Sequence, residues 1–314
     1  MNTTAYPIGT PGLPWGAAEL NQWRSSQSRR RRYDQDVTPR IERLADRFQT
    51  TDYGRLDYGG ETYTLFALKS RDWNPALPAA LVTGGVHGYE TSGVMGALEF
   101  LETRAAHYAG RVNLLAVPCV SPWGFERIHR WNYDAIDPNR SFSPDGRSPE
   151  AAALTALVAP LVGQFLLHID LHETTDGDES EFRPALAARD GKTFEPGSVP
   201  DGFYLVTDTE NHQLAFQVAI IAAVERVTHI APPDAAGEII GCPVLTPGVI
   251  AYPTRAYGMC PSITGARHTT TTEVYPDSPR ATPEQCNEAQ VVAVCTALDH
   301  VLALSSHGRR AASG

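Results

Sequence analysis

The chain has 314 residues, of which 42% are hydrophobic and 20% are charged, a composition typical of one large globular domain or two small ones. Its net charge of −10 argues against a nucleic acid or an anionic membrane as partner. No apolar run approaches the ~18 residues that a membrane span requires, and the first residues lack the basic and apolar regions of a signal peptide. We therefore expect a cytoplasmic protein. Five cysteines without a CxxC pair argue against a disulfide scaffold and against a metal bound by cysteine.

The first fifty residues predict a helical extension that leads into a hairpin. Residues 16–32 and 36–47 have the pattern of two polar-rich helices. Residues 51–70 then alternate around Gly59 and Gly60, which is typical of two antiparallel strands joined by a glycine turn.

From residue 79 onward, apolar strands alternate with helices. The predicted strands are apolar or rich in β-branched residues, and they cover residues 79–85, 113–120, 165–172, 202–208 and 269–275. The predicted helices cover residues 90–106, 148–161, 210–228 and 282–303. Ser148 and Pro149 form a good helix start, and Thr282 with Gln285 predicts a capping box at the start of the last helix.

This order of elements predicts an α/β fold. Continuous apolar strands with helices between them indicate a mixed, mostly parallel central sheet that is covered by helices on both faces. We expect one domain over residues 1–314, with the hairpin at one edge of the sheet and a disordered tail at residues 305–314. Residues 229–268 are rich in proline and glycine and predict a long excursion over the rim. In such sheets ligands bind beyond the carboxyl ends of the strands.

Side chains that suit a metal ion follow two of the predicted strands. His87 and Glu90 come directly after residues 79–85, and their spacing lets an imidazole nitrogen and a carboxylate oxygen converge on one zinc ion. His172, at the end of the predicted strand over residues 165–172, supplies a third ligand at the same edge. A lone His-x-x-Glu pair is often a chance surface pair, and His172 alone is equally well explained as a polar core residue. Their combination at two strand ends favours a metal site, and we interpret His168 as structural.

A third motif joins this pattern, because residues 130–142 read RWNYDAIDPNRSF. The chain here resembles the zinc metallocarboxypeptidase (funnelin) family, in which a His-x-x-Glu motif, an Arg-x-Asn…Asp-x-Asn-Arg-x-Phe segment, a histidine ligand and a glutamate on a late strand follow one another. All four are present in this order over about residues 80–275. The interval of 81 residues between Glu90 and His172, and the Asp-Leu-His sequence, resemble the compact succinylglutamate desuccinylase and aspartoacylase branch.

The resemblance implies roles for the residues that contact substrate. Arg130 matches the arginine that holds the carbonyl oxygen as it becomes an oxyanion. Asn139 and Arg140 match the pair that binds the terminal carboxylate, a task that suits a guanidinium because it can make two parallel hydrogen bonds. The tyrosine of the flexible carboxypeptidase loop has no clean counterpart, and Tyr252 and Tyr257 are the candidates.

The resemblance also implies roles close to the metal. Asp137 matches the aspartate that hydrogen-bonds a zinc-binding histidine, here His87, and Asp170 is a second carboxylate beside the ligands. Glu273, within the strand TTTTEVY, matches the general base that deprotonates the attacking water and later protonates the leaving amine. An exposed edge-strand glutamate is the alternative interpretation of Glu273, and Glu173 is the alternative base.

These residues predict an enzyme with one zinc ion per chain. The leading hypothesis is a metallocarboxypeptidase that hydrolyses the amide bond next to a free C-terminal carboxylate. The alternative is an amidohydrolase that acts on an N-acyl amino acid or a cell-wall peptide with the same site. A catalytically inactive binding domain is the third hypothesis, and the presence of both metal motifs together with Glu273 argues against it. The sequence does not predict the preferred side chain or the oligomeric state.

Overall fold

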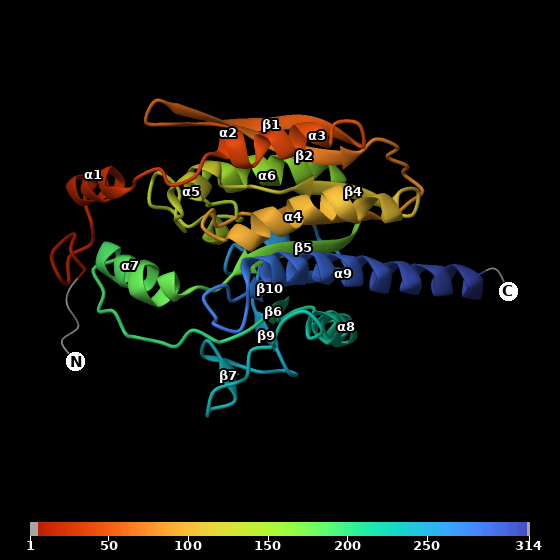
Figure 1. The fold of residues 1–314 in the computed structure, drawn as a ribbon. Helices are drawn as coiled ribbons and strands as arrows, with labels where there is room; N and C mark the ends of the chain where they lie inside the picture. Colours follow the sequence, from red (N-terminus) through yellow and green to blue (C-terminus); the bar gives the residue numbers. More distant parts are fainter. Residues whose placement is uncertain (1–5, 313–314) are drawn as a thin grey trace.

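A single mixed sheet of eight strands lies at the centre of the structure (Figure 1). The computed structural model describes residues 6–312, with side chains to residue 304, and the strand order within this range is β1-β2-β4-β3-β5-β10-β6-β9. The strands are β1 (Phe48–Tyr58), β2 (Glu61–Ser70), β3 (Ala79–Gly84), β4 (Asn113–Val117), β5 (Phe165–Glu173), β6 (Tyr204–Asp208), β9 (Val249–Tyr252) and β10 (His268–Val274). A separate two-stranded ribbon consists of β7 (Glu238–Ile239) and β8 (Cys242–Pro243).

The pairing confirms the predicted mixed sheet. Strands β4, β3, β5 and β10 run parallel to one another, so their carboxyl ends meet at one edge. The hairpin β1–β2 is antiparallel at the margin of the sheet, and its turn residues Gly59 and Gly60 both have positive φ, as a tight hairpin turn requires. Strand β9 was not predicted, because its four residues lie within a segment whose prolines and glycines indicate a loop.

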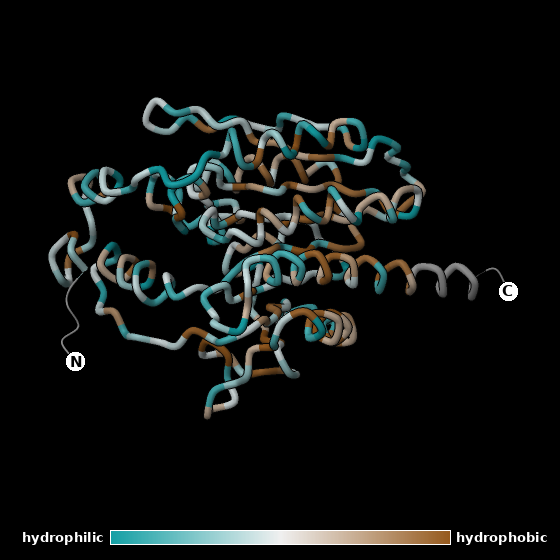
Figure 2. The backbone as a smooth tube through the Cα atoms, in the orientation of Figure 1, coloured by the Kyte–Doolittle hydropathy of each residue, from teal (hydrophilic) through white to brown (hydrophobic). Residues whose placement is uncertain are grey.

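Helices cover both faces of the sheet, as predicted. They are α1 (Ala17–Ser26), α2 (Tyr33–Asp36), α3 (Thr38–Arg43), α4 (Thr91–Thr103), η1 (Ala105–Tyr108), α5 (Pro122–Arg127), η2 (Pro138–Arg140), α6 (Pro149–Val158), η3 (Ala159–Leu161), η4 (Asp178–Phe182), α7 (Arg183–Arg189), α8 (Leu214–Val224), η5 (Cys260–Ile263) and α9 (Pro283–Ala312). Helices α4, α8 and α9 pack on one face, and α6 packs on the other. Figure 2 shows the apolar stretches on the strands and on the helices that cover them.

Alternation along β5 decides where the polar side chains go. Ile169 and Leu171 join the core beneath α4 and α9. The intervening His168, Asp170 and His172 point to the other face of the sheet, since successive strand residues point to opposite sides. All three are buried. The sheet therefore places a row of ionisable groups on one face, close to the edge where the parallel strands end.

The N-terminal helices differ from the prediction because tertiary contacts override helix propensity. Residues 27–32 are not helical; the backbone N–H groups of Arg30 and Arg31 donate to the Glu126 carbonyl instead. Two predicted caps are confirmed: Ser148 Oγ accepts the N–H of Ala151 at the start of α6, and Thr282 and Gln285 cap α9 reciprocally.

The last helix, α9, runs to Ala312 and passes the predicted end near Ala303. The sequence after Ala303 contains no proline and offers several good helix formers, which explains the extension. Residues 313–314 of the predicted tail lie outside the described residues. Within the described part of the chain, no helix has both the length and the apolar character needed to cross a membrane.

Candidate active site

Three neighbouring strands place three side chains in a row. Glu273 on β10 pairs with His172 on the parallel strand β5 and with Tyr204 on the antiparallel strand β6. Residues that are directly opposite in a sheet point to the same face. The register therefore fixes His172, Glu273 and Tyr204 side by side on the face that carries the polar residues of β5.

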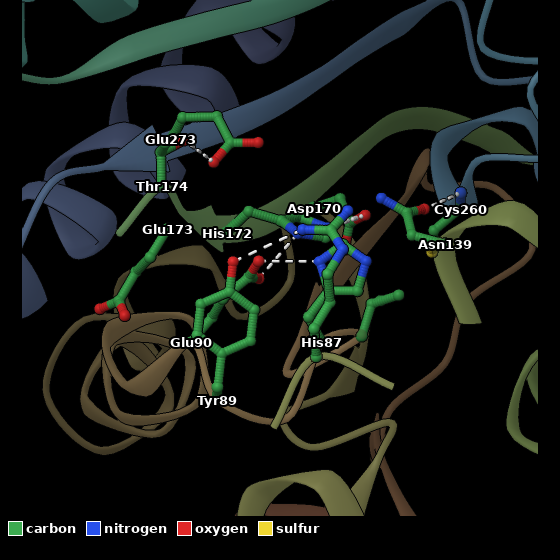
Figure 3. Close-up of polar contacts among 12 residues, drawn as sticks. His87, Tyr89, Glu90, Asn139, Asp170, His172, Glu173, Thr174, Cys260 and Glu273 are labelled. Carbon is green, nitrogen blue, oxygen red and sulfur yellow. Dashed lines mark hydrogen bonds and ion pairs between the residues drawn. The ribbon is translucent and has the colours of Figure 1, made fainter. Parts of the chain in front are cut away.

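The three predicted metal ligands converge where β3 and β5 end. His87 and Glu90 lie between β3 and α4, and their ligand atoms and those of His172 all lie within 4.8 Å of one another. His87 Nδ1 is 2.8 Å from Glu90 Oε1, and His172 Nδ1 is 2.7 Å from Glu90 Oε2 (Figure 3). All three residues are buried.

This cluster fits a cation. Glu90 Oε2 is buried and is not satisfied by a hydrogen bond among the described residues, although His172 Nδ1 lies 2.7 Å from it. A buried carboxylate oxygen in this state costs free energy unless a cation compensates it. Two imidazole nitrogens and a carboxylate oxygen are a donor set of catalytic zinc sites, which keep a fourth position open. The residues present therefore fit a zinc ion.

Each histidine also has a carboxylate on its far nitrogen. Asp137 Oδ1 is 2.9 Å from His87 Nε2, and Asp170 Oδ2 is 2.7 Å from His172 Nε2. These carboxylates hold the proton of each imidazole on Nε2. The lone pair of Nδ1 is then free to bind the cation. Burial alone would lower the pKa of His172, but Glu90 and Asp170 outweigh it and raise that pKa well above its ordinary value. Burial would likewise raise the pKa of Glu90, yet the two histidines lower it to about 2.

Two glutamates flank the cluster, and they face different directions. Glu273 Oε2 accepts a hydrogen bond from Thr174 Oγ1 at 2.9 Å, and burial raises the pKa of Glu273 to about 8. Glu173 accepts the backbone N–H groups of Thr91 and Ser92 at the start of α4, and burial raises its pKa to about 7. Figure 3 shows the Glu173 carboxylate pointing away from the two histidines. Of the two candidate bases, Glu273 is the one that shares the face of His172.

A pocket of about 380 Å³ opens over these groups. Among the predicted residues it is lined by His87, Arg130, Asp137, Asn139, Arg140, Glu173, Tyr252 and Glu273. Glu90, His172 and Asp170 lie beneath this lining and are buried. The structure thus brings the predicted residues of five separate segments to one place.

Asn139 and Arg140 present donors to the pocket. Asn139 Oδ1 accepts the N–H of Cys260 at 2.8 Å, which fixes the orientation of the amide (Figure 3). Its Nδ2 has no partner among residues 6–304. The exposed Arg140 donates to the Asn139 carbonyl, and within the same range no carboxylate pairs with its guanidinium. An amide N–H₂ and an unpaired guanidinium side by side can bind a carboxylate.

Arg130 is held by two carboxylates. Its Nε is 3.1 Å from Asp137 Oδ2, and its Nη1 is 3.4 Å from Asp178 Oδ1. Tyr89 donates to the same Asp178. Nη2 of Arg130 makes no hydrogen bond or ion pair with any described side chain, so one end of the guanidinium is available for an oxygen in the pocket.

The remaining candidates divide into two groups. Tyr252 lines the pocket, whereas Tyr257 is 47% exposed at its rim, where it contacts the Tyr252 ring and the Arg140 guanidinium. His168 is buried away from the ligand cluster, with Nε2 3.1 Å from Thr83 Oγ1. Burial lowers the pKa of His168 to about 4, which agrees with a neutral structural residue.

Sequence reasoning missed three residues of this site: Thr174, Asp178 and Tyr204. Thr174 follows the His172 ligand by two positions, and that proximity was the one available signal. Asp178 lies in an acidic segment that also suits a solvated loop. Tyr204 enters the site through the antiparallel pairing of β6 with β10, which no local pattern indicates.

Comparison with known proteins gives one family match. Residues 76–193 match the model of the succinylglutamate desuccinylase/aspartoacylase catalytic domain. That segment includes His87, Glu90, His172 and the Arg130–Arg140 motif, and it stops before Glu273. No curated protein matches in sequence.

Solved structures extend the likeness to nearly the whole chain. A candidate metallopeptidase from Shewanella amazonensis has a TM-score of 0.64 at 24% identity, over 86% of this chain and 92% of that one. A second from Shewanella denitrificans has a TM-score of 0.63 at 20% identity, over 96% and 99%. A metallo-carboxypeptidase from Pseudomonas aeruginosa, in complex with (2-guanidinoethylmercapto)succinic acid, has a TM-score of 0.57 at 14% identity, over 85% and 69%. The resemblance found in the motifs is thus confirmed: the chain has the metallocarboxypeptidase fold, and its residues 76–193 relate it to the succinylglutamate desuccinylase/aspartoacylase group.

Proposed function

We propose that this chain is a zinc-dependent metallocarboxypeptidase that hydrolyses the amide bond next to a free C-terminal carboxylate. The observation that carries the proposal is the presence, around one pocket, of the three-ligand cluster, of Glu273 and of the donors of Asn139 and Arg140. A group of three metal ligands alone is common to many hydrolases. The adjacent carboxylate-binding pair is what favours a substrate with a free acid group.

The chain's own residues perform the reaction around the metal. Held by His87, Glu90 and His172, zinc would supply a Lewis acid that polarises the scissile carbonyl and acidifies water. Glu273 accepts the proton of the attacking water at Oε1 and then donates it to the nitrogen of the leaving amine. Arg130 donates from Nη2 to the carbonyl oxygen as negative charge develops there.

Substrate orientation follows from the carboxylate-binding pair. Asn139 Nδ2 and the Arg140 guanidinium hold the terminal carboxylate, which fixes the distance from that group to the bond that breaks. The Pseudomonas aeruginosa relative binds a succinic acid derivative, which supports a carboxylate-bearing ligand for this fold.

A second candidate function is the deacylation of an N-acyl amino acid or the cleavage of a cell-wall peptide. The match of residues 76–193 to the desuccinylase/aspartoacylase domain favours it. The same residues would act, and the two functions differ in what lies on the acyl side of the bond. An inactive binding domain would bind such ligands without turnover.

The test compares two glutamate variants on a substrate panel. Peptides with varied C-terminal residues, their amides and a set of N-acyl amino acids are incubated with protein of measured zinc content. Glu273→Gln should lower kcat by at least ~10²-fold, as expected for loss of a general base, with zinc content and melting temperature near wild type. Glu173→Gln, the matched control, should keep most of the activity. Retention of more than about a tenth of kcat by Glu273→Gln contradicts the assignment.

The panel separates the candidate functions. Turnover of peptide acids supports the carboxypeptidase. Turnover of N-acyl amino acids alone supports the deacylase. Binding without turnover by the zinc-loaded protein supports the inactive domain.

A further inference from the structure

Two buried hydroxyl groups lie beside the carboxylate of Glu273, at the wall of the same pocket. Thr174 Oγ1 is 2.9 Å from Glu273 Oε2, and the Tyr204 hydroxyl is 2.7 Å from the same Thr174 Oγ1. Tyr204 is 1% exposed and Thr174 is 8% exposed. The three side chains form a short series of hydrogen bonds that ends on the proposed base. Figure 3 shows its last link, from Thr174 to Glu273.

The chemistry of the three groups decides which of them donates in each hydrogen bond. In the ionised state in which Glu273 acts as a base, its carboxylate only accepts hydrogen bonds, so the single hydrogen of the Thr174 hydroxyl goes to Glu273. Thr174 Oγ1 then accepts from Tyr204, whose hydroxyl is the donor. Hydrogen bonds in such a chain polarise one another, and those to a charged group are the stronger kind.

The backbone ties all three residues to the sheet. Thr174 directly follows β5, and its N–H donates to the Val274 carbonyl beside Glu273. Tyr204 is directly opposite Glu273 in the pairing of β6 with β10. A catalytic group carried on strands is placed more reproducibly than one carried on a loop.

We propose that Thr174 and Tyr204 are positioning residues that hold Oε2 of Glu273 and so direct Oε1 to the attacking water. This inference rests on the proposed function, since it assigns a task to residues that act through Glu273. A glutamate has several rotatable bonds and could otherwise swing within the pocket. Misplacement of a reacting group by about 1 Å can cost ~10²-fold in rate, which makes such a restraint valuable.

The main test removes the donor and keeps the shape. Thr174→Val should lower kcat by about 10- to 10²-fold with little change in KM, zinc content or melting temperature. Thr174→Ser, which keeps the hydroxyl, should restore kcat close to wild type. Tyr204→Phe should lower kcat less than Thr174→Val, because Thr174 can still donate. A crystal structure of Thr174→Val should show the Glu273 carboxylate in more than one position.

A double-mutant cycle distinguishes this arrangement from ordinary packing. Tyr204 acts only through Thr174, so Thr174→Val combined with Tyr204→Phe should have the kcat of Thr174→Val alone. Additive losses, or an unchanged kcat in Thr174→Val, overturn the inference. If Thr174→Val does not fold, an unchanged kcat in Tyr204→Phe overturns it instead. An inactive Glu273→Gln beside a fully active Thr174→Val refutes only this inference, whereas an active Glu273→Gln refutes the proposed function.

Discussion

At the scale of single residues, Arg140 is the one whose replacement should affect substrates with and without a free carboxylate most differently. Its guanidinium is exposed and has no carboxylate partner in the described part of the chain, so Arg140→Ala should leave the fold intact. Loss of a charged hydrogen-bond partner costs about 1.5–3 kcal/mol. We therefore expect KM for peptides with a free carboxylate to rise about 10- to 10²-fold, with little change for their amides.

Arg147 provides the matched control for this measurement. It is an exposed arginine that lines the same pocket but lies outside the Asn139–Arg140 pair. Arg147→Ala should change KM for acids and amides alike and by less. If Arg140→Ala affects acid and amide substrates equally, Arg140 is a structural residue and the exopeptidase hypothesis weakens with it.

A second residue, His129, links burial to acid stability. Burial lowers its pKa to about 3, and its Nδ1 accepts the N–H of Trp131. In the unfolded chain a histidine has a pKa of about 6.5. Between pH ~6.5 and about 3, His129 therefore binds a proton in the unfolded state but not in the folded state. The free energy of unfolding falls as the pH drops through this range.

The prediction concerns the slope of this loss. His129→Asn keeps an acceptor for Trp131 but does not titrate. Between pH 6 and 4 its free energy of unfolding should fall less steeply than that of wild type, by up to ~1.4 kcal/mol per pH unit. Urea unfolding at a series of pH values measures both slopes. Equal slopes would mean that the ring is solvated in the folded protein.

At the scale of elements, the sequence predicted what depends on local pattern. The strand that ends just before His87 is a continuous apolar run, and the strand that carries His172 is mostly apolar. Parallel strands end at one edge, so the convergence of the two histidines could be predicted. The position of Tyr204 could not, because it depends on how β6 pairs with β10 across long connections. The helix predicted over residues 16–32 ends at Ser26 for the same reason, since distant backbone contacts and not propensity decide the segment that follows.

A glycine in α4 lets this helix, which Glu90 precedes, pack closely against β5, which carries His172. A Cβ on Gly93 would overlap the carbonyl oxygen of Leu171, the residue before His172. Alanine would gain up to ~1 kcal/mol of helix propensity, but overpacking against backbone costs about 1–3 kcal/mol and the backbone cannot move aside cheaply. The helix start, with Glu90 before it, would have to shift away from β5.

We therefore expect Gly93→Ala to weaken zinc binding by about 10-fold or more and to lower the free energy of unfolding. Zinc titration and urea unfolding measure the two effects. Thr103→Ala, at the exposed far end of the same helix, should leave zinc affinity unchanged. A Gly93→Ala protein with wild-type zinc affinity would show that α4 and β5 can separate without disturbing the cluster.

At the scale of the whole molecule, the site is assembled from segments between residues 87 and 273 that meet only in the folded chain. The proposed ligands come from the β3–α4 connection and from β5, so a bound zinc ion would link two neighbouring parts of the sheet edge. The unfolded chain does not hold these groups together. An ion that binds the folded state alone stabilises it by mass action.

The last prediction follows from this linkage. At a free zinc concentration of about 100 times Kd, the stabilisation is ~2.7 kcal/mol, which for a domain of this size raises the melting temperature by about 5 °C. A chelator should remove the increase and added zinc should restore it. His172→Ala should abolish the response, because the third ligand is lost. His168→Asn, which changes another buried histidine on the same face of β5, should keep it whatever its own melting temperature. A His172→Ala protein that still responds to zinc, beside a His168→Asn protein that does not, would transfer the third ligand to His168.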